Sequence, residues 1–378
     1  MQRCSRCVNL STRPRIEFVG GVCSACRYAE KRAKIFPEEW KKRSNEFMRI
    51  CDKYRRYDGS YDCIVPCSGG KDSSRVAYEM KYKYRMNPLA VTFAPVIATG
   101  EGQRNIEALR VAGIDNVVFH PNEKVMSRLC REMFLRFGDP FLPWVIGIYS
   151  FPLRLAKEMS IKLVVYAECG EVAYGGDSKM SDKALDVGLM QKLASTGSEG
   201  FKSPKDWVKF GFSKEDIYPF IVPDDISGID AVFFAYYHPW SVKFNKKFAE
   251  KYCGFKGMEG RMLGTYQGYS SIDDKIDGLY MYLMYCKFGF ARCTKDCCKE
   301  IREGTLSRDE ALSLIGRYDG EFPYTKKGFK ELLAYLNIIP FDFWAVVTNF
   351  INPIVWKRTN VNRWVNSEGA VLKLPLWM

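Results

Sequence analysis

Apolar and polar positions alternate in blocks along residues 61–166, and each apolar block is followed by a helical pattern. Helix-like stretches separate the short apolar runs. We predict strands at 62–66, 89–94, 117–120 and 162–166, and helices at 71–84, 102–112, 124–137 and 144–158. This order is typical of an α/β fold with a doubly wound, mostly parallel sheet, covered by helices on both faces. Ligands of such sheets bind at the carboxyl ends of the strands.

The segments around this block have other patterns. Residues 1–35 lack regular periodicity, whereas residues 37–57 carry apolar side chains at helical spacing and predict an amphipathic helix with a basic outer face. Residues 167–230 are rich in Gly, Ser and Asp and predict loops with short helices that cover a site. Residues 231–236 predict an aromatic-rich strand.

From residue 242 onward the pattern is mostly helical, and the chain ends in a tail that contains Trp356, Trp364 and Trp377. We therefore predict three regions: an N-terminal segment with four cysteines at the spacing of a zinc-binding segment, followed by a basic helix, at 1–57, an α/β domain at 58–240, and a mainly helical region at 241–378.

Composition and charge limit the binding partners and the cellular location that we expect for this chain. The chain has 378 residues and a net charge of +13, and residues 1–57 alone hold 15 Lys and Arg against 6 Asp and Glu. A basic segment can bind a nucleic acid, an acidic ligand or an acidic partner protein, and the net charge alone does not distinguish between these three. No uninterrupted apolar stretch of membrane-spanning length occurs, and the N-terminus lacks a signal-peptide pattern. We expect a cytoplasmic protein without a membrane span, and its 14 cysteines to be reduced or metal-bound.

A glycine pair follows the first strand of the α/β block, in the run Ser68-Gly69-Gly70-Lys71-Asp72-Ser73-Ser74. Glycines let the backbone approach an anion, and free N–H groups at a helix start favour negative charge. The hydroxyls add donors, and Lys71 adds a positive charge where pyrophosphate would leave. We therefore predict that all seven residues bind nucleotide and that Lys71 is catalytic. The spacing is not that of a Walker A loop.

The hexapeptide 68–73 resembles the signature of the PP-loop ATP pyrophosphatases, which have the adenine nucleotide alpha hydrolase-like fold, and the resemblance covers about residues 60–170. It implies an enzyme that cleaves ATP between the α and β phosphates and places AMP on a carbonyl oxygen. It also implies that Asp72 orients the loop or holds Mg²⁺, with a catalytic role.

Four N-terminal cysteines have the spacing of a structural zinc site, Cys4-x2-Cys7-x15-Cys23-x2-Cys26. Four thiolates fill the coordination sphere of Zn²⁺, so the ion would stabilise a segment that has little apolar core. An iron–sulfur cluster is the alternative. A second group, Cys293, Cys297 and Cys298, has no evident fourth ligand nearby.

The loop after the last strand of the block carries a second set of polar residues. Two carboxylates beside glycine turns could bind Mg²⁺, a sugar hydroxyl or ammonium. We assign Glu171 a catalytic role and name as substrate-binding candidates Glu168, Tyr174, Gly175, Gly176 and, at the end of the third strand, His120.

Together with two later runs, these motifs resemble the N-acetyl sugar amidotransferase family over nearly the whole chain. The later runs are 275–292, with Lys287-Phe288-Gly289-Phe290-Ala291-Arg292, and 301–320, with Ile301-Arg302-Glu303-Gly304 and Tyr318-Asp319-Gly320. The chain departs from the family pattern at Val172 and at Lys295-Asp296.

The resemblance implies conversion of an acetamido group to an acetamidino group through an adenylated intermediate and ammonia, for O-antigen or flagellin glycans. It also implies a nucleotide-activated diacetamido sugar as substrate, and a glutaminase subunit and a cyclase-like subunit that deliver ammonia.

Two other functions fit parts of the sequence. A tRNA thiolation enzyme also combines Cys-x-x-Cys pairs with such a loop, and Cys130 and Cys169 would then handle sulfur. However, thiolation enzymes of this kind usually have a second zinc ribbon near the C-terminus, and no cysteine follows Cys298 here. We therefore regard nucleic acid as the less favoured partner. A scaffold without ATP turnover is the third possibility, with the tryptophan-containing tail as its docking surface.

Overall fold

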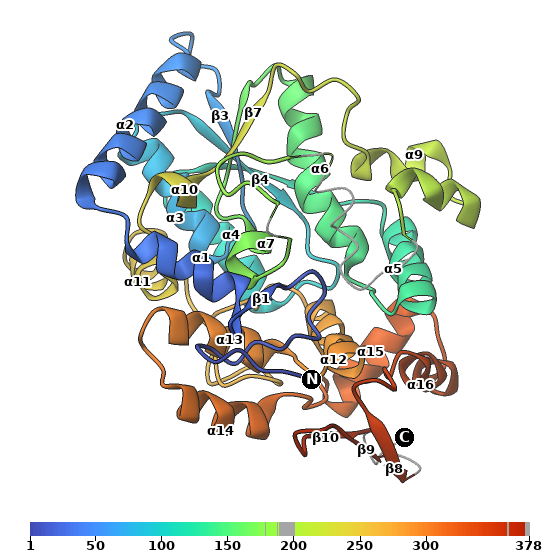
Figure 1. The fold of residues 1–378 in the computed structure, drawn as a ribbon. Helices are drawn as coiled ribbons and strands as arrows, with labels where there is room; N and C mark the ends of the chain where they lie inside the picture. Colours follow the sequence, from blue (N-terminus) through green and yellow to red (C-terminus); the bar gives the residue numbers. More distant parts are fainter. Residues whose placement is uncertain (178, 187, 189–200, 361–362, 375–378) are drawn as a thin grey trace.

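The computed structural model describes the chain apart from residues 178, 187, 189–200, 361–362 and 375–378 (Figure 1). Its centre is a five-stranded sheet in the order β5-β4-β3-β6-β7, in which all neighbouring strands are parallel. The strands are β3 (Cys63–Pro66), β4 (Pro88–Phe93), β5 (Asp115–Phe119), β6 (Leu163–Tyr166) and β7 (Asp230–Phe233). The predicted fold class, a parallel sheet with a cysteine-rich N-terminus and a helical C-terminal region, is confirmed.

Helices cover both faces of the sheet (Figure 1). They include α2 (Pro37–Tyr54), α3 (Lys71–Tyr82), α4 (Gly100–Val111), α5 (Glu123–Phe137) and α6 (Leu142–Glu158). Side chains of β3 alternate between the faces: Cys63 and Val65 pack with residues of α2 and α3, whereas Ile64 packs with residues of α6. This double burial explains why the strands read as short apolar runs.

The order of the strands creates a crevice beside β3. The chain passes from β3 to β4 on one side, and β6 lies on the other side of β3. The connections that leave the carboxyl ends of β3 and β6 therefore diverge, which is the arrangement in which open α/β sheets bind ligands.

The N-terminal segment is more regular than its sequence predicts. It forms a hairpin of β1 (Phe18–Val19) and β2 (Val22–Cys23), followed by the ten-residue helix α1 (Ser24–Ala33). Helix α1 buries only Ala25 and Cys26, so it shows no apolar stripe in the sequence.

The segment between β6 and the C-terminal helices contains α7 (Gly170–Tyr174), η1 (Pro204–Phe210), α9 (Lys214–Ile217) and η2 (Tyr218–Phe220). The strand predicted at 231–236 is too long, because β7 ends at Phe233 and α10 (Phe234–Tyr237) follows. The ring of Phe47 in α2 contacts the rings of both Phe234 and Tyr237, with distances of 5.3 and 5.0 Å between the ring centroids. A helical turn places these two positions on one side, whereas a strand would point them to opposite faces.

The C-terminal region contains α11 (Val242–Tyr252), α12 (Ile276–Phe288), α13 (Arg292–Arg302), α14 (Arg308–Tyr318), α15 (Lys326–Leu336) and α16 (Pro340–Asn349). The tail then forms an antiparallel sheet of β8 (Lys357–Asn360), β9 (Arg363–Val365) and β10 (Val371–Lys373), which the helical prediction missed. Trp356 and Trp364 are buried in the core, whereas Trp377 lies outside the described residues.

In the part of the chain that the structure describes, no single helix has the length and apolar composition of a membrane span. Helices α15 and α16 reach these limits only together, and they are bent by 88° at the break between them.

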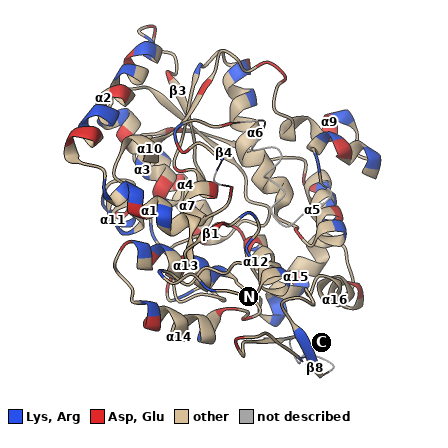
Figure 2. Ribbon diagram, viewed as in Figure 1, with Lys and Arg blue, Asp and Glu red and all other residues tan. Residues whose placement is uncertain are grey.

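Basic residues are frequent on α1 and α2 (Figure 2). Several of their guanidinium groups donate hydrogen bonds to backbone carbonyls of the same chain: Arg32 Nη2 to Ala235 (2.8 Å) and Arg43 Nη1 to Tyr236 (3.2 Å). Part of the N-terminal charge therefore fixes these helices against α10 and is not available to an external partner.

Candidate active site and metal centre

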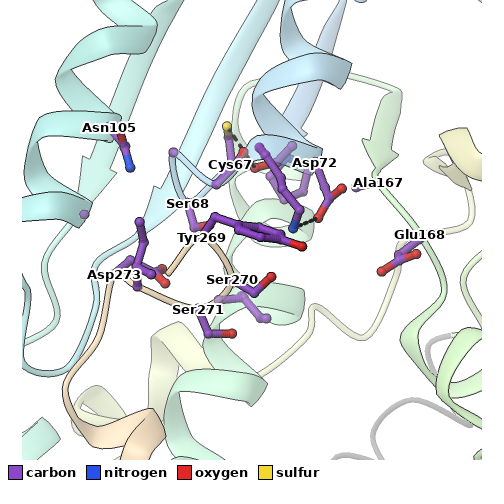
Figure 3. Close-up of a pocket in the computed structure, with 18 of the residues that line it drawn as sticks. Cys67, Ser68, Asp72, Asn105, Ala167, Glu168, Tyr269, Ser270, Ser271 and Asp273 are labelled. Atoms are coloured by element: carbon purple, nitrogen blue, oxygen red, sulfur yellow. Dashed lines mark hydrogen bonds and ion pairs between the residues drawn. The ribbon is translucent and has the colours of Figure 1, made fainter. Parts of the chain in front are cut away.

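A pocket of about 360 Å³ opens at the carboxyl ends of β3 and β6. Its walls come from places far apart in the sequence, among them the turn after β3, helices α4 and α6, the loop after β6, the connection before α12, and helix α13. Figure 3 shows Tyr269, Ser270 and Ser271 facing the turn after β3, with Glu168 towards one side of the pocket and Asn105 and Asp273 towards the other. The pocket thus occupies the place that the sheet topology predicts for a ligand.

The turn after β3, which we call the glycine loop (residues 67–70), leads directly into α3 at Lys71. Gly69 has φ +77°, and a Cβ atom there would lie 2.7 Å from the backbone nitrogen of Ile106. Gly70 has φ −69° and meets only the Ser68 hydroxyl, at 3.3 Å. The two glycines therefore serve different purposes, since only Gly69 needs a conformation that a side chain disfavours.

This difference gives a matched pair of variants. Gly69→Ala should lose binding of an ATP analogue by about tenfold or more, because the loop must move away from α4 to make room. Gly70→Ala should keep the fold and most of the binding. Calorimetric titration of both variants tests the prediction, and equal behaviour of the two would contradict it.

Six of the seven predicted nucleotide-binding residues line the pocket: Ser68, Gly69, Gly70, Lys71, Asp72 and Ser73. Ser74 does not; it is buried, and its carbonyl accepts a contact from the Cys253 thiol (3.5 Å). Ser74 therefore belongs to the packing of α3.

Lys71 and Asp72 form part of a buried polar network. Lys71 Nζ lies 2.9 Å from Asp72 Oδ2, and Asn245 of α11 donates to Asp72 Oδ1 (2.6 Å). Arg75 in turn donates to Asn245 and to Glu79 (2.7 Å). Burial by itself raises the pKa of Asp72, but the ammonium of Lys71 brings this pKa below its ordinary value. Asp72 is thus an ionised group that orients Lys71.

The connection between α11 and α12 forms one wall of the pocket. Asp274 accepts hydrogen bonds from the backbone N–H groups of Ile97 and Ile276, both at 3.0 Å, and fixes this connection beside β4. Its neighbour Asp273 lines the pocket, where burial and the charge of Asp274 raise the pKa of Asp273 to about 7. A carboxyl group that titrates near neutral pH in a pocket is suited to proton transfer.

Helix α13 presents one polar face to the pocket. Its lining residues are Arg292, Lys295, Asp296 and Lys299, at helical spacings of three and four. Lys299 Nζ lies 3.2 Å from Glu168 Oε1, and its ammonium lies over the ring of Tyr174, 4.3 Å from the centroid. Glu168 and Tyr174 therefore line the pocket beside Lys299, and their role in substrate binding stays a prediction.

The other predicted substrate residues lie elsewhere. Glu171 forms an ion pair with Arg15 of the N-terminal segment (2.7 Å) and accepts from the backbone of Asp177 (2.9 Å). A Cβ atom on Gly175 would meet Ala25 of α1 at 3.2 Å, and one on Gly176 would clash with Glu171. His120 is exposed and lines a separate cavity, whose other lining residues come mostly from the connection after β4 and from α4 and α5. These residues do not line the pocket of the glycine loop; Glu171 and Gly175 contact the N-terminal segment and attach the loop after β6 to it.

The four N-terminal cysteines converge as their spacing predicts. Their Sγ atoms all lie within 4.8 Å of one another, with Cys4–Cys26 at 3.9 Å and Cys7–Cys23 at 3.7 Å. Zn–S bonds of about 2.3 Å in a tetrahedron place sulfurs about 3.8 Å apart. The cluster can therefore hold a metal ion such as zinc, and its distances fit a tetrahedral ion.

The surroundings of this cluster also suit a metal–thiolate centre. Burial lowers the pKa of the guanidinium group of Arg302 in α13, but the nearby thiols of Cys298, Cys7, Cys26 and Cys23 raise this pKa above its ordinary value, and among the described residues the buried Nη1 atom has no hydrogen-bond partner. Four thiolates around Zn²⁺ leave a net negative charge, which a guanidinium group would compensate. Arg302 Nη2 also donates to the Ala173 carbonyl (3.1 Å), so this side chain joins the cluster to α7.

Sequence reasoning missed the residues that the C-terminal region brings to the pocket. They are Tyr269, Ser270, Ser271, Asp273, Arg292, Lys295, Asp296 and Lys299, and Asn245 acts behind the pocket through its hydrogen bond to Asp72. One usable signal was the polar spacing along 292–299, because three cations and an acid recur there at helical intervals. The side chains of 269–273 gave no comparable pattern.

Two comparisons with known proteins bear on this chain. Residues 263–369 match the family described as LPS biosynthesis protein WbpG-like, C-terminal domain. An uncharacterized protein of Methanocaldococcus jannaschii is 34% identical over 91 residues, which is 24% of this chain and 31% of that protein. The C-terminal region is therefore similar to a domain of lipopolysaccharide biosynthesis proteins, which supports the predicted connection with this process.

Proposed function

We propose that this protein is an ATP-dependent, AMP-forming amidotransferase that converts an acetamido group of a nucleotide-activated sugar to acetamidino, for O-antigen or flagellin glycan synthesis. The observation that carries the proposal is the joint origin of the pocket. The glycine loop, with its resemblance to PP-loop enzymes, forms one wall, and the region similar to lipopolysaccharide biosynthesis proteins forms another.

In the proposed reaction the amide oxygen attacks the α-phosphorus of ATP, and the bond to pyrophosphate breaks. Ammonia then adds to the imidoyl carbon, one proton leaves the nitrogen, and the C–O bond breaks as AMP departs with the former amide oxygen. Activation is needed because an amide oxygen leaves poorly, whereas AMP leaves well.

The residues of the chain would act on charge and position. Backbone N–H groups of the glycine loop and the start of α3 would hold the phosphates, and Lys71 would stabilise the departing pyrophosphate. Asp72 would keep Lys71 in place, as their contact of 2.9 Å indicates. Glu168 and Tyr174 would contact the sugar, since both line the same pocket. Mg²⁺ would neutralise charge on the phosphates.

The thiolation alternative finds less support. A sulfur-handling cysteine needs an accessible thiolate. Cys130 and Cys169 are buried, neither lines the pocket, and burial raises the pKa of Cys130 well above its ordinary value and that of Cys169 to about 11. The scaffold alternative loses its main argument as well, because Trp356 and Trp364 pack inside the chain.

The deciding experiment is an assay of the purified protein with ATP, ammonium chloride and nucleotide-activated diacetamido sugars. We expect AMP together with a sugar product about one dalton lighter, because an amidine has NH where the amide has oxygen. Glutamine should replace ammonium only when the proposed glutaminase and cyclase-like subunits are added. AMP release with unmodified tRNA and a sulfur donor, without any change in the sugars, would overturn the proposal in favour of thiolation.

A further inference from the structure

Helix α13 brings three cations to the pocket, and two of them have acidic partners. Arg292 forms an ion pair with Asp277 of α12, and Lys299 pairs with Glu168. Lys71, which comes from α3, is paired with Asp72. The positive charges of Arg292, Lys299 and Lys71 are thus each compensated by a carboxylate of the protein.

Lys295 differs from these three. Among the described residues, its Nζ atom has no carboxylate within ion-pair distance, and the contact it makes is with the sulfur of Met281, at 3.8 Å. The rings of Tyr174 and Tyr280 lie 5.6 and 5.5 Å from the ammonium. Lys295 nevertheless lines the pocket, so a ligand in the pocket can reach it.

Nearby positive charges further disfavour the charged form of the Lys295 side chain. Burial, Arg292 and Arg13 lower the pKa of Lys295 to about 7, and the carboxylates Asp277 and Asp296 oppose this only in part. Arg13 is itself buried, and its Nε atom has no hydrogen-bond partner among the residues that the structure describes. An ammonium group without a counter-ion in such surroundings is costly, and an anion that enters the pocket would remove the cost.

The helix start does not account for an anion site here. The backbone N–H groups of Ala291 and Thr294 are already occupied by the Asp319 carboxylate, at 3.0 and 3.1 Å. The free positive group at this end of α13 is therefore the side chain of Lys295 and not the backbone.

We propose that Lys295 anchors an oxyanion, a carboxylate or a phosphate, of the second substrate, in a subsite of the pocket separate from the glycine loop. This inference rests on the proposed function in one respect, namely that ATP occupies the glycine loop. The subsite would position the acceptor by its negative group and would favour acidic acceptors over neutral ones of the same shape.

The test uses the reactivity of Lys295 itself. Native protein is saturated with α,β-methylene ATP and treated with an amine-reactive reagent at neutral pH, and modification of each lysine is read by peptide mass spectrometry. D-glucuronate and inorganic phosphate serve as probes, D-glucose is the neutral counterpart of glucuronate, and the exposed Lys42 is the internal reference.

We expect at least one of the two anions to slow modification of Lys295 by about tenfold, with no effect of glucose and none on Lys42. Protection by glucuronate identifies a carboxylate subsite, and protection by phosphate alone identifies a phosphate subsite. Lys295→Met should weaken binding of the protecting anion by about tenfold or more, whereas Lys295→Arg should retain it.

Two results would overturn the subsite. One is complete protection by the ATP analogue alone, because Lys295 would then serve the phosphates of ATP. The other is unchanged modification with both anions at high millimolar concentration. If the ATP analogue does not bind at all, the proposed function fails, but the anion titration without nucleotide still tests the subsite.

Discussion

Replacing Lys71 by alanine should lower the rate of AMP formation by about a hundredfold to a thousandfold, while the protein stays folded. The reason is that Lys71 Nζ lines the pocket, oriented by Asp72 at 2.9 Å, and that one preorganised group at a developing charge contributes about this much to a rate. The measurement is steady-state AMP release with a sugar acceptor, accompanied by a thermal melt.

The matched control is Lys83→Ala, at the residue that directly follows α3. Lys83 forms an ion pair with Glu79, but its side chain is 51% exposed and lies away from the pocket. Its removal should change turnover little, because the Lys83 ammonium is exposed to solvent and the buried Glu79 keeps its ion pair with Arg75, at 2.7 Å. Full turnover by a folded Lys71→Ala protein would sink the assignment of Lys71.

Loss of the metal centre should have the second large effect. Cys4→Ser should reduce bound zinc from about one ion per chain to nearly none and lower the free energy of unfolding by more than about 4 kcal/mol. The four cysteines belong to the cluster that packs the N-terminal segment against α13 and α14, so metal–sulfur bonds at its centre would supply much of the stability of this segment. Metal analysis and chemical denaturation are the measurements.

Turnover should fall in this variant as well, because the N-terminal segment supports the loop that carries Glu168 and Tyr174. Asn9 donates to the Tyr174 carbonyl at 3.2 Å, and Arg15 pairs with Glu171. Glu171 is then a positioning residue that acts through this contact.

The control for the metal centre is Cys298→Ala. Cys298 lies next to the Cys7 thiol but is not one of the four converging cysteines. This variant should keep its zinc. Unchanged zinc in Cys4→Ser would contradict the proposed ligand set, and iron with a brown colour in the native protein would favour the iron–sulfur alternative.

The sequence by itself determined the features that depend on residues close to one another along the chain. The run from Asp62 to Ser74 places a strand, a glycine turn and a helix start within a few residues, and local backbone preferences fix that order. The Cys-x-x-Cys pairs are equally local, since two turns of fixed length bring their thiols together. The burial of β3 and β6 on both faces produced the apolar runs that predicted the sheet.

Only the tertiary structure decided which distant residues meet at the pocket. Asn245 reaches Asp72 across 173 positions, and Asp273 and Lys295 enter from a region whose helical pattern does not reveal its neighbours. It also separated Glu168 from Glu171, which are three residues apart but point to different partners. The physical reason is that local propensities fix elements, whereas packing between elements fixes which of their faces become a site.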